Sequence, residues 1–411
     1  MVNEYIYFNR TTYQAFQWVS KVLLLLSATL LYFSYAYAQD SITTSVSAAY
    51  YYDSNLFRLS DDEAKQQPED AGTSDVIRRI GGSLKARIPL SRQLLNVNAA
   101  FQNVKFNRFD YLDYTGGNAE VSWDWRVGKH WNGDVGMDYL RTQPNYGELQ
   151  IVERDIRTKS GVRFNLHYDP SPSIRARATL KWSDGEHSAD QLKVLNRQVR
   201  RVESEIRYLS SARSYLGIRF TFSDISYPER LFIEGSFIDN GFNDSSISLT
   251  LRTRPTRKTT LEGWVGYTLR SYSNLSSKNY DGYTGRLKHI WSVSHKVQVV
   301  STVWGDFDPV DDGYSNQIVK TGLNLIPTWS MTEKIALQGL ASYEIRDYSN
   351  FNANTASSRE DAKYTIGGSL NYAMYRSLRF GIALRSEKRN SSTEKWSYKY
   401  DYAMMSMTVT I

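Results

Sequence analysis

Basic side chains recur at every second position in several segments of this chain. Between Leu84 and Leu90, for example, Lys85 and Arg87 alternate with apolar residues. Successive residues of a β-strand point to opposite faces, so these two side chains would share one face. Guanidinium and ammonium groups bind carboxylates and phosphates, and arginine can do so through paired hydrogen bonds. The spacing therefore predicts rows of anion-binding groups on one side of a sheet.

The same alternation assigns further charged and aromatic residues to polar strand faces. The predicted polar-face cations are Arg79, Lys85, Arg87, Arg163, Arg175, Arg177, Lys181, Arg207, Arg219, Arg379 and Arg385. Acidic residues are fewer there, with Glu203, Glu205 and Glu262 the clearest, and Trp264 could stack on a sugar ring. Two interpretations stay open and are compatible with each other: the cations form a path for an acidic polymer, or they pair with neighbouring carboxylates and brace the fold.

Other arrangements that could carry chemistry are less specific. His187 lies near Asp184 and Ser188, but nothing in the spacing orients them as a catalytic triad. The acidic stretch 61–70 offers oxygen ligands in a spacing that matches no calcium loop. The chain has 0 Cys, which excludes disulfides, thiolate metal sites, cysteine nucleophiles and lipoprotein anchoring. We therefore expect neither enzymatic activity nor a metal or other cofactor.

The elements that would carry the polar faces are β-hairpins. Residues 84–90 and 95–101 alternate apolar and polar around a tight turn that begins at Pro89 and Ser91. The same period of two returns in 162–168, 174–180, 216–223, 366–372 and 378–385. Short turns alternate with long polar connections along the chain, as they do in outer-membrane barrels. The 30 Tyr and 10 Trp suit the aromatic girdles of such a barrel.

We predict an all-β fold, a transmembrane antiparallel up-and-down β-barrel of about 18 strands, with about 16 as the alternative. The barrel would occupy residues 39–411 as one domain, with both ends on the periplasmic side. In the last segment, Val409 and Ile411 would face lipid. The chain ends in Ile411, whereas the terminal strand that barrel-assembly machinery recognises usually ends in Phe or Trp.

The first residues resemble a secretory signal peptide. Lys21 precedes a short apolar run, and small residues at Ala36 and Ala38 predict cleavage before Gln39. The alternative is an uncleaved anchor, but the run is shorter than the ~20 residues that a spanning helix needs. We therefore expect a signal peptide at 1–38 and a mature protein in the outer membrane of a Gram-negative bacterium. The net charge of +7 is dispersed along strands, so we expect no nucleic-acid partner.

The segment YYDSNLFRLSDDE, residues 51–63, resembles the opening of the exosortase-associated exopolysaccharide biosynthesis outer-membrane proteins, the EpsL type. The chain length, the signal peptide and the hairpins rich in Tyr and Arg are also similar to that family. The resemblance implies a role in the export or biosynthesis of an extracellular, acidic polysaccharide. The expected partners are the polymer itself, outer-membrane lipid, the barrel-assembly machinery and periplasmic export components. The alternative functions are a general or anion-preferring diffusion porin and, less favoured, an outer-membrane barrel hydrolase.

Overall fold

The computed structural model describes residues 42–66, 72–149, 152–210, 214–233, 236–274, 276, 279–308, 315–350 and 359–411. The predicted signal segment, with Ala36, Ala38 and Gln39, lies outside the described residues. No helix among the described residues has both the length and the apolar character needed to span a membrane. Residues Thr44–Ile411 form one compact unit.

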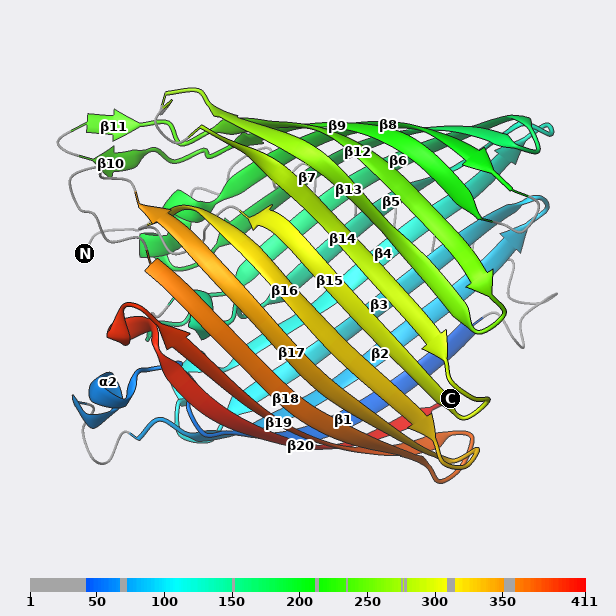
Figure 1. Ribbon diagram of the computed structural model, residues 1–411. Coiled ribbons are helices and arrows are strands. Elements are labelled where there is room, and N and C mark those ends of the chain that lie inside the picture. Colours follow the sequence, from blue (N-terminus) through cyan, green and yellow to red (C-terminus); the bar gives the residue numbers. More distant parts are fainter. Residues whose placement is uncertain are drawn as a thin grey trace, which may run out of the picture. The chain divides into compact units, whose positions relative to one another are not determined.

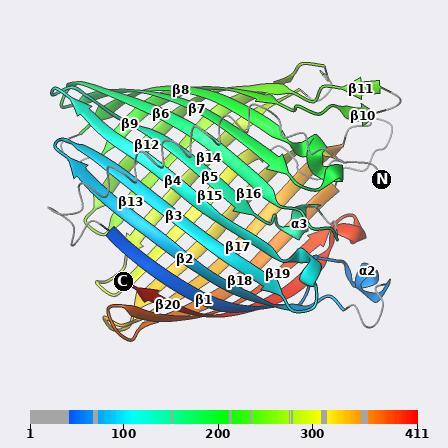
Figure 2. The same cartoon turned by 180° about the vertical axis from the view of Figure 1, so that it is seen from behind.

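An 18-stranded antiparallel sheet closes on itself to form a barrel (Figures 1 and 2). Neighbours in sequence are neighbours in the sheet, and β1 pairs with β20 through the register Ser45↔Thr410 to complete the ring. The barrel strands are β1 (Ile42–Asp53), β2 (Asp75–Leu90), β3 (Gln93–Phe106), β4 (Tyr114–Val127), β5 (Trp131–Thr142), β6 (Arg157–Ser171), β7 (Ile174–His187), β8 (Arg197–Leu209), β9 (Tyr215–Ser226), β12 (Phe242–Thr256), β13 (Thr259–Tyr272), β14 (Tyr280–Ser292), β15 (Val297–Asp308), β16 (Ser315–Ser330), β17 (Ile335–Asn350), β18 (Arg359–Ala373), β19 (Leu378–Ser391) and β20 (Tyr398–Thr410). The larger of the two predicted strand counts is therefore confirmed.

The long connections gather at one end of the barrel and the short turns at the other (Figure 1). The long connections carry the remaining elements, which are α2 (Asp61–Gln66), η1 (Asp110–Leu112), α3 (Tyr146–Leu149), η2 (Asp190–Leu195), the hairpin of β10 (Leu231–Ile233) and β11 (Ser236–Ile238), and η4 (Glu394–Trp396). At the opposite end, Ile411 exchanges backbone hydrogen bonds with Thr44 at 2.8 and 3.2 Å. The C-terminus therefore lies at the end with the short turns, as the alternation of connections predicts.

The outer face of the barrel is apolar and accessible. Phe101 and Ile206 are each 66% exposed, and similar side chains recur on nearly every strand. A water-soluble protein rarely shows so large a continuous apolar surface, whereas a barrel in lipid requires one. Met405, Met407 and Ile411 of the last segment lie on this face, as the alternation with Val409 and Ile411 outward predicts.

Candidate functional site

The lumenal face carries the predicted cations. In each strand they occupy the residues between those that hold the outer apolar side chains, so alternation directs them inward. The pairing registers are consistent with this from strand to strand: Arg163 is opposite Lys181, Arg175 is opposite Arg207, and Arg219 is opposite Glu205. The candidate site is therefore the lumenal wall as a whole.

Two arginines of the β6–β7 hairpin are held by carboxylates. Arg163 Nε lies 3.2 Å from an Asp134 oxygen, and Arg175 donates two hydrogen bonds to Asp169 at 2.5 and 2.7 Å. Such paired groups brace neighbouring strands and offer little charge to a passing anion. The bracing interpretation therefore applies to these arginines.

Glu205 joins two further arginines. Its carboxylate accepts hydrogen bonds from Arg177 at 3.1 Å and from the Thr250 hydroxyl at 2.6 Å, and it lies 2.8 Å from Arg207. Glu205 is only 5% exposed, so the two cations offset the cost of burying its charge. Arg163, Arg175 and Arg177, three of the predicted polar-face cations, are thus each engaged by a different carboxylate.

The remaining predicted cations differ in their surroundings. The guanidinium of Arg79 lies 4.5 Å from the ring centre of Tyr51, and that of Arg219 lies 5.2 Å from Trp264. Arg385 lies beside Tyr400. Within the described part of the chain, no carboxylate pairs with Lys85, Arg87, Lys181 or Arg379. These four contribute to the charge that the lumen leaves available.

Several lumenal cations were missed by the sequence interpretation. They are Arg201, Arg252, Arg270, Arg286, Lys288, Lys320, Arg346, Arg359, Lys363 and Arg389. In β14 the signal was present, because Arg286 and Lys288 flank the outward Leu287. The outward residues of that strand include glycine, aspartate and histidine, so the alternation of apolar and polar residues is weak there.

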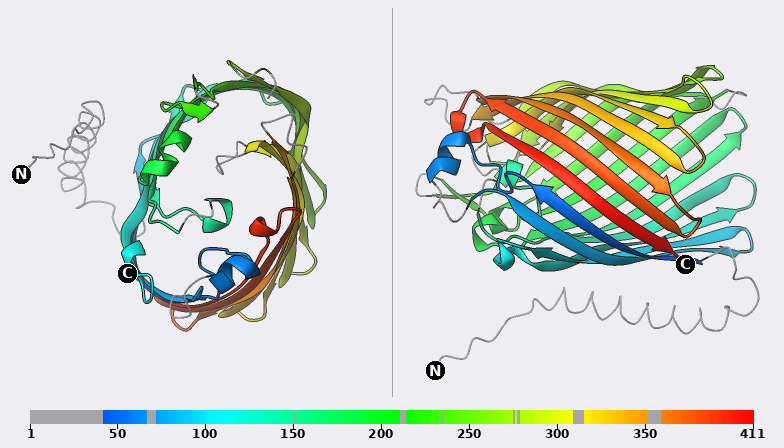
Figure 3. Two further views of the ribbon diagram at one scale, coloured as in Figure 1. Left: turned by 90° about the vertical axis from the view of Figure 1, so that its left-hand side faces the viewer. Right: turned by 90° about the horizontal axis from the view of Figure 1, so that it is seen from below.

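Two long connections bend into the lumen at the outer end and narrow it (Figure 3, left). In the first, Arg58 donates to Asp53 at 2.8 and 2.9 Å, and its guanidinium lies 3.5 Å from the ring centre of Tyr400. Burial lowers the pKa of Arg58, but pairing with Asp53 outweighs this and raises the pKa above its ordinary value. The Asn55 side-chain amide donates to the Leu59 carbonyl at 2.8 Å and accepts from the Leu59 N–H at 3.0 Å. The residues that carry the family resemblance therefore anchor a loop.

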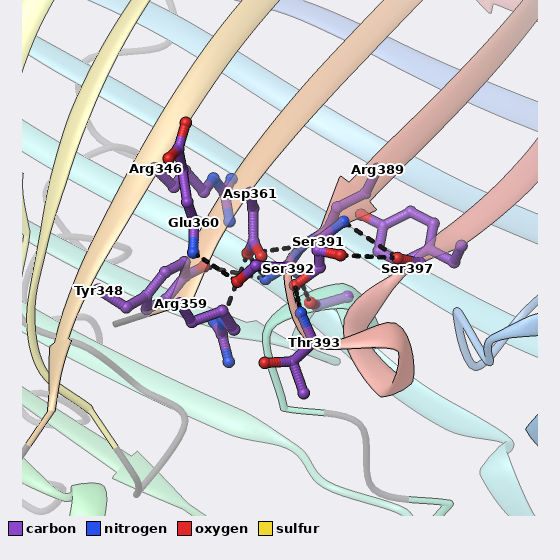
Figure 4. A network of polar contacts seen from close by, with 12 residues as sticks. Arg346, Tyr348, Arg359, Glu360, Asp361, Arg389, Ser391, Ser392, Thr393 and Ser397 are labelled. Atoms are coloured by element: carbon purple, nitrogen blue, oxygen red, sulfur yellow. Dashed lines mark hydrogen bonds and ion pairs between the residues drawn. The ribbon is translucent and has the colours of Figure 1, made fainter. Parts of the chain in front are cut away.

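The second inward connection reaches the opposite wall. Tyr146 in α3 packs on Phe57 with ring centres 5.0 Å apart, and Arg389 of β19 donates to the Gly147 carbonyl at 2.7 Å. Arg389 also donates to Asp361 at 2.9 Å and to the Tyr348 hydroxyl at 2.9 Å (Figure 4). This buried network ties the connection to the far side of the barrel.

Two hollows remain open along the wall formed by β8–β17. One has a volume of about 460 Å³ and is lined by residues that include Arg201, Arg219 and Trp264. The other has a volume of about 580 Å³ and is lined by residues that include Arg286 and Trp304. Asp306 borders both, so the hollows adjoin. Small-molecule sites in proteins have volumes in this range.

Known proteins show what this architecture is similar to. A family model described as "Putative beta-barrel porin 2" matches residues 250–411. Among solved structures, the outer membrane protein OpdK from Pseudomonas aeruginosa has a TM-score of 0.51 at 10% identity over 90% of this chain and 100% of its own. OccK9 (OpdG) from the same organism has a TM-score of 0.51 at 9% identity over 90% and 98%, and OccK2 (OpdF) has 0.50 at 8% over 90% and 98%. No curated protein matches the chain.

The chain is a β-barrel of a bacterial outer membrane. At these identities the likeness to solved structures shows the fold alone. The family match supports a porin and does not reach the EpsL type suggested by residues 51–63.

His187, the histidine singled out in the sequence, pairs with a residue outside the cluster of Asp184 and Ser188. His187 Nδ1 lies 2.6 Å from Asp155, and both side chains are buried. Asp184 points to the opposite face of β7, because it is an odd number of residues from His187. The Ser188 hydroxyl accepts a hydrogen bond from Ile156 N at 2.7 Å and contacts Asp155, not His187. These residues therefore form a loop anchor and not a nucleophile–base pair.

Asp155 should make this anchor sensitive to acid. Burial raises its pKa, but hydrogen bonds from His187, Ala189 and Ser188 outweigh burial and leave the pKa below its ordinary value. A carboxyl group whose pKa is lowered by folding stabilises the folded state at pH values above its ordinary pKa of ~3.9. This contribution is lost as the pH falls through the pKa of the group in the folded protein.

We expect Asp155→Asn to cost about 1–3 kcal/mol in local stability at pH 7, since the amide keeps only one of the two acceptor oxygens and some of the buried donors lose their partner. Hydrogen exchange of residues 152–156 and 187–196 should speed up, and the wild type should approach the variant only below about pH 4. Asp190→Asn, at an exposed carboxylate beside Lys193, is the control and should change little. Equal exchange in the two variants would mean that Asp155 does not anchor the loop.

Proposed function

We propose that this protein is an anion-preferring diffusion porin. The observation that carries the proposal is a set of lumenal cations that have no carboxylate partner among the residues that the structure describes, including Lys85, Arg87, Lys181 and Arg379. Cations that line a water-filled pore lower the energy of anions within it and raise that of cations. The paired arginines brace the wall, so the two interpretations drawn from the sequence apply to different residues.

A role in exopolysaccharide export is the second candidate, and it rests on residues 51–63. Asp53, Asn55 and Arg58 from that segment are engaged within the outer loop, where they help to narrow the lumen. A long polymer needs a wide and continuous path, whereas small solutes need only the space beside the inward loops. This geometry favours diffusion of small anions.

Conductance in planar bilayers tests the proposal. In asymmetric potassium chloride the wild type should pass chloride in preference to potassium. Lys85→Gln combined with Arg87→Gln should lower the permeability ratio roughly two- to fourfold, because a charge ~10 Å from the ion contributes ~0.4 kcal/mol in water and salt at about 0.1 M screens most of this. The paired variant Arg175→Gln with Asp169→Asn keeps the net charge and should leave the ratio unchanged. A wild type that prefers potassium would contradict the proposal.

A deletion strain separates the two candidate functions. For a diffusion porin, loss of the protein should slow uptake of small anionic solutes and leave surface polysaccharide at its normal amount. Loss of surface polymer with normal anion uptake would favour export instead.

A further inference from the structure

The outward face of β1–β5, which lie side by side in Figure 2, contains an apolar groove of about 850 Å³. Small residues form its floor: Ala99 of β3 is opposite Ala119 of β4, and Gly117 is opposite Phe101. The Phe101 ring leans toward β2, because an added Cβ at Gly82 would lie 2.7 Å from it. A hollow of this kind in the lipid-facing surface is filled by an acyl chain or by another protein.

Three cations lie on the same face, toward the end of the barrel with the long connections. Arg78 of β2 is opposite Lys105 of β3, and Arg141 of β5 is opposite Gly117 of β4. All three cations are exposed. Arg141 lines the groove, and its Nε donates to the Thr115 carbonyl at 3.2 Å, so its guanidinium lies toward β4. The groove therefore ends in a basic surface.

Two of these three cations have no carboxylate partner. Lys105 Nζ lies 2.9 Å from Asp113, whereas Arg78 and Arg141 form no ion pair with any residue that the structure describes. Within the described strands β1–β6, none of the outward residues in the half nearer the long connections is acidic. Like charges directly opposite each other destabilise a sheet, so Arg78 beside Lys105 favours binding of an anion from outside the protein.

The other sectors of the barrel differ in charge. At the same level of β7–β20, the outward carboxylates outnumber the outward cations, which are Arg200, Lys388 and Lys399. The carboxylates include Asp184, Glu186, Asp224, Asp281, Asp347 and Glu360. The excess of positive charge is therefore confined to the sector that holds the groove.

We propose that this surface binds a phosphorylated glycolipid of the outer leaflet. One acyl chain lies in the groove between Phe101 and Tyr139, and the headgroup phosphates contact Arg78, Lys105 and Arg141. Long connections face the cell exterior in outer-membrane barrels, so the three cations lie at the level of the outer-leaflet headgroups. Guanidinium groups bind phosphate through paired hydrogen bonds.

The spacing of the cations suits a headgroup with two phosphates. Neighbouring strands are about 4.8 Å apart, so β2 and β4 are separated by about 10 Å. Arg78 lies on β2 and the Arg141 guanidinium lies toward β4. Two phosphates at opposite ends of a disaccharide headgroup can reach both arginines, whereas a lipid with a single phosphate reaches one.

Native mass spectrometry of the folded barrel in detergent tests the cations. Diphosphoryl lipid A should bind more tightly than phosphatidylglycerol, and millimolar inorganic phosphate should not displace it. Arg78→Gln with Arg141→Gln should weaken lipid A binding about 10-fold or more, the loss expected for hydrogen bonds between charged groups. Arg200→Gln with Lys388→Gln removes the same charge from other sectors and should change the binding little.

A second pair of variants tests the groove. Ala99→Leu with Ala119→Leu fills its floor and should weaken lipid A binding about two- to threefold. This loss is smaller because a displaced chain is still surrounded by apolar tails and not by water. Ala178→Leu, at an outward alanine of β7 outside the groove, is the matched control. The heat-shifted band checks that each variant is folded.

Four results would contradict the glycolipid site. Unchanged lipid A binding in the arginine variant would reject the cations as its partners. Equal binding of phosphatidylglycerol would show that any anionic lipid suffices, and displacement by inorganic phosphate would assign the cations to a free anion. A dimer that dissociates in the alanine variant while lipid binding is unchanged would identify a second copy as the occupant. Every changed residue faces outward, so the anion preference of the pore should stay the same and the porin function is tested separately.

Discussion

Phe220→Arg should destabilise the barrel by about 2–4 kcal/mol, the cost of an arginine on the lipid face near the bilayer midplane. Phe220 lies near the middle of β9, is 55% exposed and points outward. An arginine there would carry its charge into the hydrocarbon or would have to thin the bilayer around it. Urea unfolding in lipid vesicles measures the free energy, and the heat-shifted band in detergent gels reports folding.

The neighbouring residue supplies the control. Thr221 lies on the lumenal side of β9 and lines the 460 Å³ hollow. Thr221→Arg places the same charge one residue away in a wet lumen and should change the unfolding free energy by less than about 1 kcal/mol. If Thr221→Arg destabilises the barrel as much as Phe220→Arg does, the assignment of strand faces is wrong.

Arg389→Met should cost about 3–5 kcal/mol, because it leaves the buried carboxylate of Asp361 without its main partner. Asp361 is 0% exposed, and its other cation, Arg359, lies 3.5 Å away. The variant also removes the donor to the Gly147 carbonyl, so the second inward connection loses its attachment to β19. We therefore expect a larger and noisier single-channel conductance together with the loss of stability.

Lys399→Met on β20 is the matched control for Arg389→Met. Lys399 lies 4.0 Å from Asp401 with 63% of its side chain exposed, and exposed pairs contribute little. The unfolding free energy of the Lys399→Met variant should be lower than that of the wild type by less than about 1 kcal/mol. An unchanged conductance in Arg389→Met would mean that the network in Figure 4 does not hold the connection in place.

The barrel itself could be predicted from the sequence because its signal is local. In 84–90 each side chain's face follows from its position in the strand alone, and the structure directs Leu84 and Leu90 outward as the pattern requires. The order of short and long connections likewise predicted which end of the barrel holds Ile411.

The partners of the lumenal cations could not be predicted in the same way. Alternation assigns Arg163 and Arg177 to the inner face, but their carboxylates, Asp134 and Glu205, lie 29 and 28 residues away on neighbouring strands. Which cation is paired depends on the register between strands, and that register follows from turns whose lengths the sequence leaves uncertain. The period of two therefore predicted the charge of the lumen and not its distribution.

The sequence alone determined the fold class, the strand faces and the excess of lumenal cations, because each follows from neighbouring residues. Only the tertiary structure decided which contacts particular side chains make. His187 meets Asp155 through a loop contact 32 residues away, and Arg389 meets Gly147 across 242 residues. The pair of Arg78 and Lys105 on the outer face likewise exists only once β2 and β3 are aligned. Such contacts depend on closure of the whole ring and on the inward path of the loops, which no local period encodes.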